Sequence, residues 1–146
     1  MKQFFLALTL SFVTVLSVAA RPVSEDPAVE KTFRQLFTGA SNVTWSKESR
    51  DLVKASFLWG QHHTVAYFDN KGNLLGSIRG LFFTQLPLSV IRSVNTQYAD
   101  HMILEVREIS NDEGVSYSLI SEHKGKRYKL RYDSLGGLID KARVRK

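Results

Sequence analysis

Two stretches with one shared pattern decide the fold: Phe68-Asp69-Asn70-Lys71-Gly72-Asn73-Leu74 and Tyr132-Asp133-Ser134-Leu135-Gly136-Gly137-Leu138. Both follow aromatic-Asp-x-x-Gly-x-Leu, and their starts are 64 positions apart. An aspartate at the first turn position caps the backbone two residues later, and the glycine tolerates the positive φ that closes a hairpin with a bulge. The pattern therefore predicts two corresponding hairpin tips in a duplicated, β-rich chain.

The first twenty residues have the features of a signal peptide. Lys2 provides a positive start, an apolar run extends from Phe4 to Val18, and Ala19-Ala20 supplies the small residues that signal peptidase requires. The apolar run is shorter than the roughly 20 residues of a membrane-spanning helix. We expect cleavage after Ala20, a periplasmic or secreted protein, and one domain over residues 21–146. An uncleaved membrane anchor is the alternative.

Composition narrows the function classes. The chain contains no cysteine, which excludes disulfides, a thiol nucleophile and a lipid-modified N-terminal cysteine. The formal net charge of +6, to which Lys2 contributes one unit, favours anionic partners such as acidic proteins, anionic envelope polymers or membrane surfaces. Because the protein is expected to be exported, nucleic acid is not an expected partner.

The order of predicted elements is the same in the two halves of the chain. A helix is expected to begin with Asp26 as N-cap and Pro27 as its first residue, and a second opens at Leu86-Pro87. Strand-like segments follow each helix, at about 43–48, 52–59, 62–69 and 73–79, and at about 102–109, 114–122, 126–132 and 137–145. The predicted fold class is α+β: a tandem duplication of a helix plus four antiparallel strands, with repeats at about 25–80 and 86–146. Both helices are expected on one face of a curved sheet.

Alternation within the strands predicts which side chains face the helices. The inward candidates are Trp45, Ala55, Phe57, Trp59 and Phe68 in the first half, and Leu104, Val106, Val115, Tyr117, Leu119, Tyr128, Leu130 and Tyr132 in the second. The link between the halves carries Leu81, Phe82 and Phe83, which are too apolar for a free linker. We expect them to pack between the halves and to join both repeats in one structure.

This layout resembles a known family. The two hairpin motifs, the segment Asn42-Val43-Thr44-Trp45 after the first helix, and Leu86-Pro87 before the second are similar to the PepSY-like, β-lactamase-inhibitor-like exported proteins of Bacteroidetes-type bacteria. The resemblance spans nearly all of residues 25–146. It implies a tandem helix-plus-sheet repeat with a curved sheet face available to a partner. The chain lacks the disulfides of the inhibitor after which the family is named, and a shared fold does not establish inhibition.

The sequence offers little for catalysis or metal binding. It has no Gly-x-Ser-x-Gly elbow and no phosphate-binding glycine loop. His62 and His63 are adjacent on a strand, so they should point to opposite faces and cannot readily share one ion. His101 and His123 are isolated, and nothing in the sequence brings them together. The oxygen-rich turn after Asp69 lacks the distant glutamate of a calcium loop, so turn formation explains it. No cofactor or metal is expected.

The last hairpin suggests a basic surface on the sheet side opposite the helices. If Tyr132 lies opposite Leu138, a regular register places Lys129 opposite Lys141 and Arg127 opposite Arg143. Like charges directly opposed destabilise a sheet by some tenths of a kcal/mol, which favours an anionic partner. The alternative is pairing with Glu105, Glu108 and Glu122, or simple solvation. The predicted interaction face comprises Leu58, Val65 and Tyr67 for apolar contact, with Arg127, Lys129, Arg131, Lys141 and Arg143 for charge.

These features predict a non-enzymatic exported binding protein that engages a protein, a peptide or an anionic polymer through a sheet face. An inhibitor of proteases or β-lactamases is the more specific alternative within the same class. A hydrolase or a metal-dependent enzyme is the alternative from another class. It would require His62 or His63 to meet a carboxylate from another strand in a cleft.

Overall fold

The computed structural model describes residues 26–144, so the predicted signal peptide lies outside the described residues. The elements in chain order are α1 (Pro27–Leu36), β1 (Ser41–Ser49), β2 (Leu52–Trp59), β3 (His62–Asp69), β4 (Leu74–Gly80), the 3-10 turn η1 (Phe83–Gln85), α2 (Leu88–Gln97), β5 (Met102–Asn111), β6 (Gly114–His123), β7 (Lys126–Asp133) and β8 (Leu138–Val144). All eight strands form one antiparallel sheet, and each strand pairs with its neighbour in sequence. The α+β class and the predicted order of elements are confirmed.

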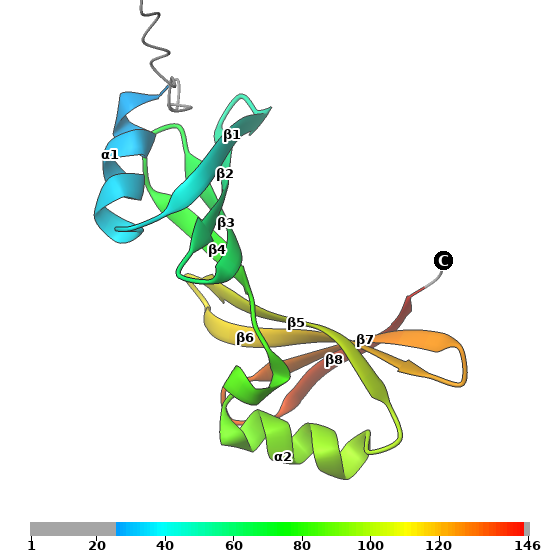
Figure 1. The fold of residues 1–146 in the computed structure, drawn as a ribbon. Helices are drawn as coiled ribbons and strands as arrows, with labels where there is room; N and C mark the ends of the chain where they lie inside the picture. Colours follow the sequence, from blue (N-terminus) through cyan, green and yellow to red (C-terminus); the bar gives the residue numbers. More distant parts are fainter. Residues whose placement is uncertain (1–25, 145–146) are drawn as a thin grey trace, which may run out of the picture.

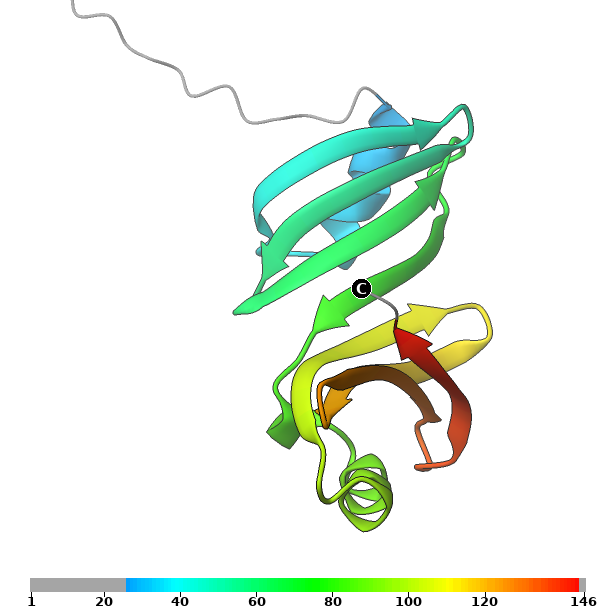
Figure 2. The same cartoon turned by 90° about the vertical axis from the view of Figure 1, so that its right-hand side faces the viewer.

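Both helices cover the same side of this sheet, here called the helix face, and the other side is the open face (Figure 1). A continuous row of paired residues across the helix face, from Phe57 through Arg79 and Glu108 to Tyr132, connects the two halves. The sheet bends strongly between the halves, so their open faces turn toward each other. Figure 2 looks onto the open face of β1–β4, with α1 behind the sheet.

Each half has its own hydrophobic core between its helix and the sheet. In the first half, Phe33 of α1 packs edge-on against Trp45 and Phe57, at ring-centroid distances of 5.0 and 4.8 Å. In the second half, Val90 and Val94 of α2 pack on a group that includes Leu119, Leu130 and Tyr132. The inward side chains predicted for the first half are confirmed.

The two hairpin tips form identical hydrogen-bond patterns. Asp69 Oδ1 accepts from the backbone N–H groups of Lys71 and Asn73, at 2.9 and 2.8 Å. Asp133 Oδ1 accepts from those of Leu135 and Gly137, both at 2.8 Å. In each tip the glycine N–H also bonds the aspartate carbonyl, which closes the predicted turn. The turn interpretation of both motifs is therefore confirmed.

The tip glycines also hold the helices in place. Gly72 and Gly136 have φ angles of 85° and 88°, in the left-handed region. A Cβ at Gly72 would lie 2.8 Å from the backbone carbonyl of Ala28, and one at Gly136 would lie 2.6 Å from the carbonyl oxygen of Ser89. Each tip therefore requires its glycine for two reasons: the positive φ angle, and the close approach of the first turn of the helix.

Three expectations about apolar residues need correction. Leu104 and Val115 are exposed, although Val115 shares the side of Tyr117 by strand alternation. A register shift between Ile103 and Glu105 moves Leu104 out of the alternation, and Ile103 packs against the second core instead. In the link, Leu81 and Phe83 pack against the second core, whereas Phe82 is exposed. The link therefore packs mainly on the second half, although the exposed ring of Phe82 contacts His62 of the first half at a centroid distance of 6.1 Å.

Candidate binding face

An apolar strip crosses the open face at the joint between the halves. It consists of Leu58, Val65, Ile78 and Ile109, which come from the four adjacent strands β2 to β5. Val65 lies directly opposite Ile78, and Ile78 lies opposite Ile109, so these side chains point to the same side. All four are partly buried although no helix covers them. The sequence predicted Leu58 and Val65 for this face, but not the two isoleucines that complete the strip.

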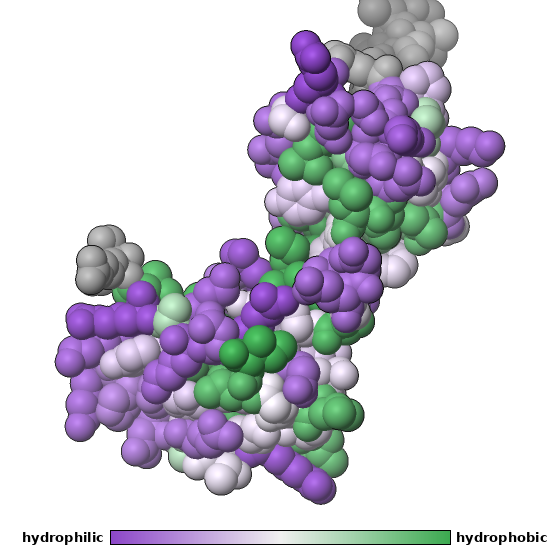
Figure 3. Space-filling view, turned by 180° about the vertical axis from the view of Figure 1, so that it is seen from behind, coloured by the Kyte–Doolittle hydropathy of each residue, from purple (hydrophilic) through white to green (hydrophobic). Residues whose placement is uncertain are grey.

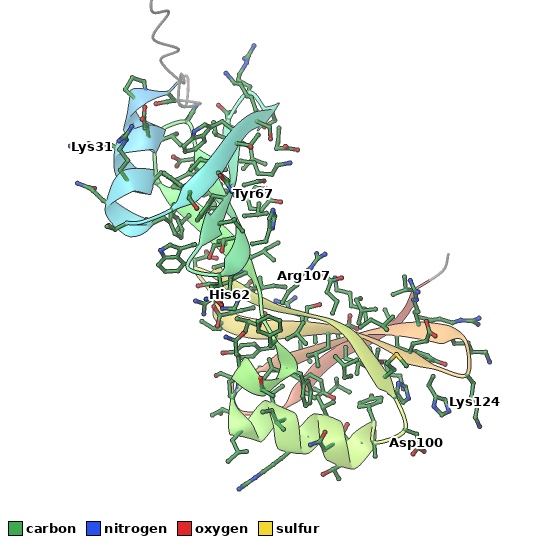
Figure 4. All side chains as sticks on the ribbon, in the orientation of Figure 1. Lys31, His62, Tyr67, Asp100, Arg107 and Lys124 are labelled. Carbon is green, nitrogen blue, oxygen red and sulfur yellow. The ribbon has the colours of Figure 1, made fainter. Side chains whose placement is uncertain are left out.

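Small residues lie beside the strip on the open face. Gly76 lies opposite Tyr67, and on β6 the buried Ser116 and Ser118 continue the open face into the second half. Tyr67 from the first half and Arg107 from the second both project on the open side (Figure 4). Seen from behind, apolar side chains gather where the halves meet, and strongly hydrophilic side chains occupy the far end of each half (Figure 3).

The predicted basic face must be corrected, because the register of β7 and β8 shifts by one residue. A bulge follows the tip, so that Tyr132 lies opposite Leu138 but Arg131 lies opposite Asp140. Lys141 then pairs with Leu130 and Arg143 with Tyr128, which places both cations on the helix face. The predicted facing pairs of like charges, Lys129 with Lys141 and Arg127 with Arg143, do not exist. The same bulge occurs between β3 and β4 after Tyr67.

The cations that remain on the open face are only partly neutralised. Arg127 Nε lies 2.9 Å from a carboxylate oxygen of Glu122, as the internally paired alternative expected. Arg131 donates from Nε to the hydroxyl of Ser116 at 3.3 Å and lies opposite Asp140. Lys129 is exposed and forms no ion pair within residues 26–144.

Glu105 and Glu108, the other two glutamates expected to neutralise this face, have different partners. Glu105 pairs with Arg107 of its own strand. Glu108 lies 2.8 Å from Arg79 across the β4–β5 joint, on the helix face. The Arg79 guanidinium also lies 5.8 Å from the ring of Trp59, so this ion pair stabilises the joint and leaves the basic residues of β7 unaffected.

His101 and His123, which the sequence left isolated, stack on each other at the end of α2. Their ring centroids are 4.8 Å apart, with an angle of 13° between the ring planes. His123 Nδ1 donates to the carbonyl oxygen of Asp100 at 3.2 Å, and His101 Nδ1 lies 3.1 Å from the hydroxyl oxygen of Ser121. We call these two residues the histidine pair. The antiparallel pairing of β5 with β6 brings these two histidines together, and no local sequence pattern predicts the contact.

The surroundings of His101 disfavour its protonation. Burial lowers the pKa of His101, and the nearby charges of His123 and Lys141 lower it further, while Asp100 opposes them. Lys141 Nζ lies 5.0 Å from the ring of Tyr98 and 5.2 Å from that of Tyr128, which is a cation–π arrangement. Lys141 is therefore held against aromatic rings on the helix face, away from the predicted open-face site.

His62 and His63, the remaining candidates for catalysis or metal binding, do not lie in one site. His62 lies on the helix face, where its ring contacts Phe82 and its Nε2 lies 3.3 Å from the side-chain nitrogen of Gln85. His63 is exposed and lies opposite Leu58 on the open face. Within residues 26–144 no three His, Cys, Asp or Glu side chains gather as metal ligands. The carboxylate partner that an enzyme would require does not meet His62 or His63 in these contacts.

Comparison with known proteins identifies the fold. No known family model and no curated protein matches the sequence. The structure is similar to a BLIP-like protein from Bacteroides fragilis, with 20% identity, a TM-score of 0.74, and coverage of 86% of this chain and 89% of that one. A DUF2874 family protein from Bacteroides ovatus matches with 18% identity, a TM-score of 0.74, and coverage of 83% and 89%. A candidate periplasmic protein from Bacteroides eggerthii matches with 12% identity, a TM-score of 0.72, and coverage of 81% and 88%.

These similarities confirm the predicted resemblance at the level of the fold. Identities of 20% and below say nothing about shared partners. Among residues 26–144, neither helix has the length and apolar character needed to cross a membrane.

Proposed function

We propose that this chain is a non-enzymatic exported protein that binds a protein or peptide through its open face. The observation that carries the proposal is the apolar strip of Leu58, Val65, Ile78 and Ile109, which no helix covers within the described residues. Protein interfaces commonly combine a central apolar patch with a polar, charged rim. Here Tyr67, Arg107 and Lys129 supply such a rim.

The test places a photoreactive residue at Ile78, in the middle of the strip, and in parallel at Leu36. Leu36 is an apolar, exposed residue of α1 on the opposite side of the sheet and serves as the matched control. Irradiation in the native envelope should produce discrete adducts from position 78 and none from position 36. The partner, once identified and purified, should lose at least tenfold in affinity for Ile78→Glu, because burying an unpaired carboxylate is costly. Equal adducts from both positions would contradict the proposal.

Export is supported by the features of residues 1–20 and by the candidate periplasmic protein among the structural neighbours. The chain isolated from its host should therefore begin at Arg21 and fractionate with periplasmic or secreted proteins. N-terminal analysis of the purified protein measures this directly. A chain that retains Met1 and sediments with the membranes would support the anchored alternative.

A second candidate, inhibition of a β-lactamase or protease, is favoured by the fold shared with a BLIP-like protein. The same open face would bind the enzyme, so this candidate specifies the partner of the proposed site. Titration of purified β-lactamases and proteases with micromolar protein tests it. Full enzyme activity throughout the titration would remove the inhibitor candidate and leave the binding proposal intact.

We also infer that the two halves arose by duplication of one helix-plus-four-strand unit, over residues of about 25–80 and 86–146. The matching tip hydrogen bonds and the matching glycine–helix contacts support this inference. Replacing residues 69–73 with the sequence of residues 133–137 should then leave the unfolding free energy within about 1 kcal/mol, since the same backbone bonds can form. A larger loss would show that the tips are not interchangeable.

A further inference from the structure

The far end of the second half carries cations that lack partners. The β6–β7 hairpin projects beyond the end of α2, and Lys124 marks its tip (Figures 1 and 4). Lys124 and Lys126 on this hairpin and Arg143 on β8 are exposed. None of the three forms an ion pair within the described part of the chain, in contrast to Arg34, Lys54, Arg79, Arg107 and Arg127. We call Lys124, Lys126 and Arg143 the basic end.

The basic end adjoins the histidine pair. Lys126 lies directly opposite His123, and Arg143 lies opposite Tyr128, so these side chains belong to the helix face beyond the last turn of α2. The ring of Tyr128 also contacts His101, at a centroid distance of 5.7 Å. Cations, imidazoles and an aromatic ring thus share one surface.

The groups facing the histidine pair include few acids. They are Tyr98 and Asp100 after α2, Ser121 and Lys126 on the β6–β7 hairpin, Tyr128 on β7 and Lys141 on β8. Asp100 is the only carboxylate in this set. Positive charge therefore exceeds negative charge here at neutral pH, and the surplus grows when His101 is protonated.

We propose that the basic end and the histidine pair form a binding surface for a polyanionic chain, such as an acidic polysaccharide, which binds more tightly as the pH falls. The cations are spread over a hairpin tip and a neighbouring strand, which suits several contacts with charges that repeat along a polymer. Aromatic and imidazole rings beside them can stack on sugar rings. This surface differs from the apolar strip, so the inference does not depend on the proposed function.

An anionic lipid surface fits this end less well. Basic side chains alone contribute only about 1 kcal/mol each at an anionic membrane surface, and stable binding there gains from apolar side chains on the same face. The exposed apolar residues at this end, Met102 and Val144, lie opposite Glu122 and Arg127 respectively, on the open face. Lys126 and Arg143 lie on the helix face. The cations and the apolar residues therefore cannot enter one membrane surface together.

Proton linkage gives the direction of the pH effect. The pKa of His101 is lowered in the free protein, first by burial and then by the positive charges nearby. A bound polyanion favours the protonated imidazole and so raises this pKa, which means that the complex takes up protons. Binding must then strengthen as the pH falls through the range around the ordinary histidine value of about 6.5.

The experiment titrates the chain from Arg21 onward with dextran sulfate and with polygalacturonate, using neutral dextran as the control. Both acidic polymers should bind and neutral dextran should not, and added salt should weaken the binding. Between pH 7.5 and pH 5.5 the affinity should increase by about tenfold, which is what a one-unit rise in a single pKa produces. His101→Gln/His123→Gln should bind with about the same affinity at pH 7.5 and at pH 5.5. A pH effect that persists in this variant would overturn the role of the histidine pair.

A matched pair of variants distinguishes the effect of the basic end from the effect of the overall charge. Lys124→Gln/Lys126→Gln/Arg143→Gln removes three positive charges from the basic end, and Lys47→Gln/Arg50→Gln/Lys71→Gln removes three exposed ones from the first half. The first variant should lose at least tenfold in affinity and the second less than twofold. Equal losses, or binding to phosphatidylglycerol vesicles but to neither polymer, would overturn the proposal. Ile78→Glu should leave polymer binding unchanged, so failure here is distinguishable from failure of the open-face proposal.

Discussion

The two halves of the molecule form the same contact with different side chains. In each half, a side chain of the second hairpin (β2–β3 or β6–β7) donates a hydrogen bond to the loop that follows the helix. In the first half, Trp59 Nε1 donates to the carbonyl oxygen of Thr38 at 3.2 Å. In the second half, His123 Nδ1 donates to the carbonyl oxygen of Asp100 at the same distance. The indole of Trp59 carries no charge at physiological pH, whereas the imidazole of His123 stacks on His101, whose pKa is lowered by burial, so the second half carries a titrating group beside this contact.

The two cores also differ in polarity at one equivalent position. Phe68 and Tyr132 precede the two tip aspartates, and both side chains are fully buried. The hydroxyl of Tyr132 finds no hydrogen-bond partner among the described residues, while Phe68 has no such group to satisfy. The comparison shows that the backbone contacts are shared by the halves, while the second half has His123 and Tyr132 at the positions of Trp59 and Phe68.

The largest effect should come from the aromatic core of the first half. Phe33→Ala removes a ring that contacts four other aromatic rings and should lower the unfolding free energy by about 3–5 kcal/mol. Val94→Ala in α2 removes two methyl groups and should cost about 2 kcal/mol. Denaturant unfolding should be followed by tryptophan fluorescence, which reports the first half alone, and by circular dichroism. Equal losses for the two variants would contradict the difference between the cores.

The next effect tests what the halves share. Gly72→Ala and Gly136→Ala should each cost about 2–4 kcal/mol, because alanine is strained at positive φ and its Cβ would meet the helix backbone. Thermal unfolding of both variants measures the two losses. Gly125→Ala, also at positive φ but with nothing near its Cβ, is the control and should cost only the strain of about 1–2 kcal/mol. A clear inequality between the Gly72 and Gly136 variants would break the equivalence of the tips.

A smaller effect, of opposite sign, is expected at Tyr132. Tyr132→Phe should stabilise the protein by about 1 kcal/mol, since it removes a buried hydroxyl that lacks a partner. Burial raises the pKa of Tyr132 to about 12. The unfolded chain therefore releases this proton first, and stability should fall as the pH rises from about 10 toward 12. Alkaline unfolding should show this loss for the wild type and a reduced loss for the variant. A destabilised variant would indicate that the hydroxyl has a partner.

The smallest expected effect is the acid response of His101. Because the pKa of His101 is lowered in the folded protein, the unfolded chain binds protons first, and stability should decline as the pH falls below about 6.5. His101→Gln should flatten this decline between pH 7.5 and pH 5. Trp59→Phe, which removes the first-half contact, should lower stability by the same amount at every pH in this range. An unchanged acid decline in the His101 variant would place the titrating group elsewhere.

The sequence was informative where local chemistry determines structure. The Asp-x-x-Gly tips, the Asp26-Pro27 helix start and the inward aromatic residues of β1–β3 were all predictable from turn preferences, capping and alternation. Asp26 indeed accepts from the N–H of Ala28 at 2.9 Å. The element order and the α+β class followed from these signals. Whether eight strands join into one sheet did not, because only the β4–β5 pairing decides it.

The candidate site was predicted less well, because it depends on register. One bulge after Tyr132 moved Lys141 and Arg143 to the helix face, since a shift of one residue reverses the face of every following side chain. Ile78 and Ile109 were not predicted for the open face because they lie on strands from different halves. His101 and His123 are 22 positions apart in the chain. Only the pairing of β5 with β6 brings them into contact.

The two outer strands of the sheet have a consequence for how the protein remains dispersed at high concentration. An unpaired strand edge is a template for aggregation, and proteins protect such edges with bulges and charged side chains. β1 has register shifts near both of its ends, and β8 is exposed throughout and carries Asp140, Lys141 and Arg143. Both edges thus discourage the addition of a further strand. The sheet can therefore leave the apolar strip uncovered on its open face without extending into fibrils.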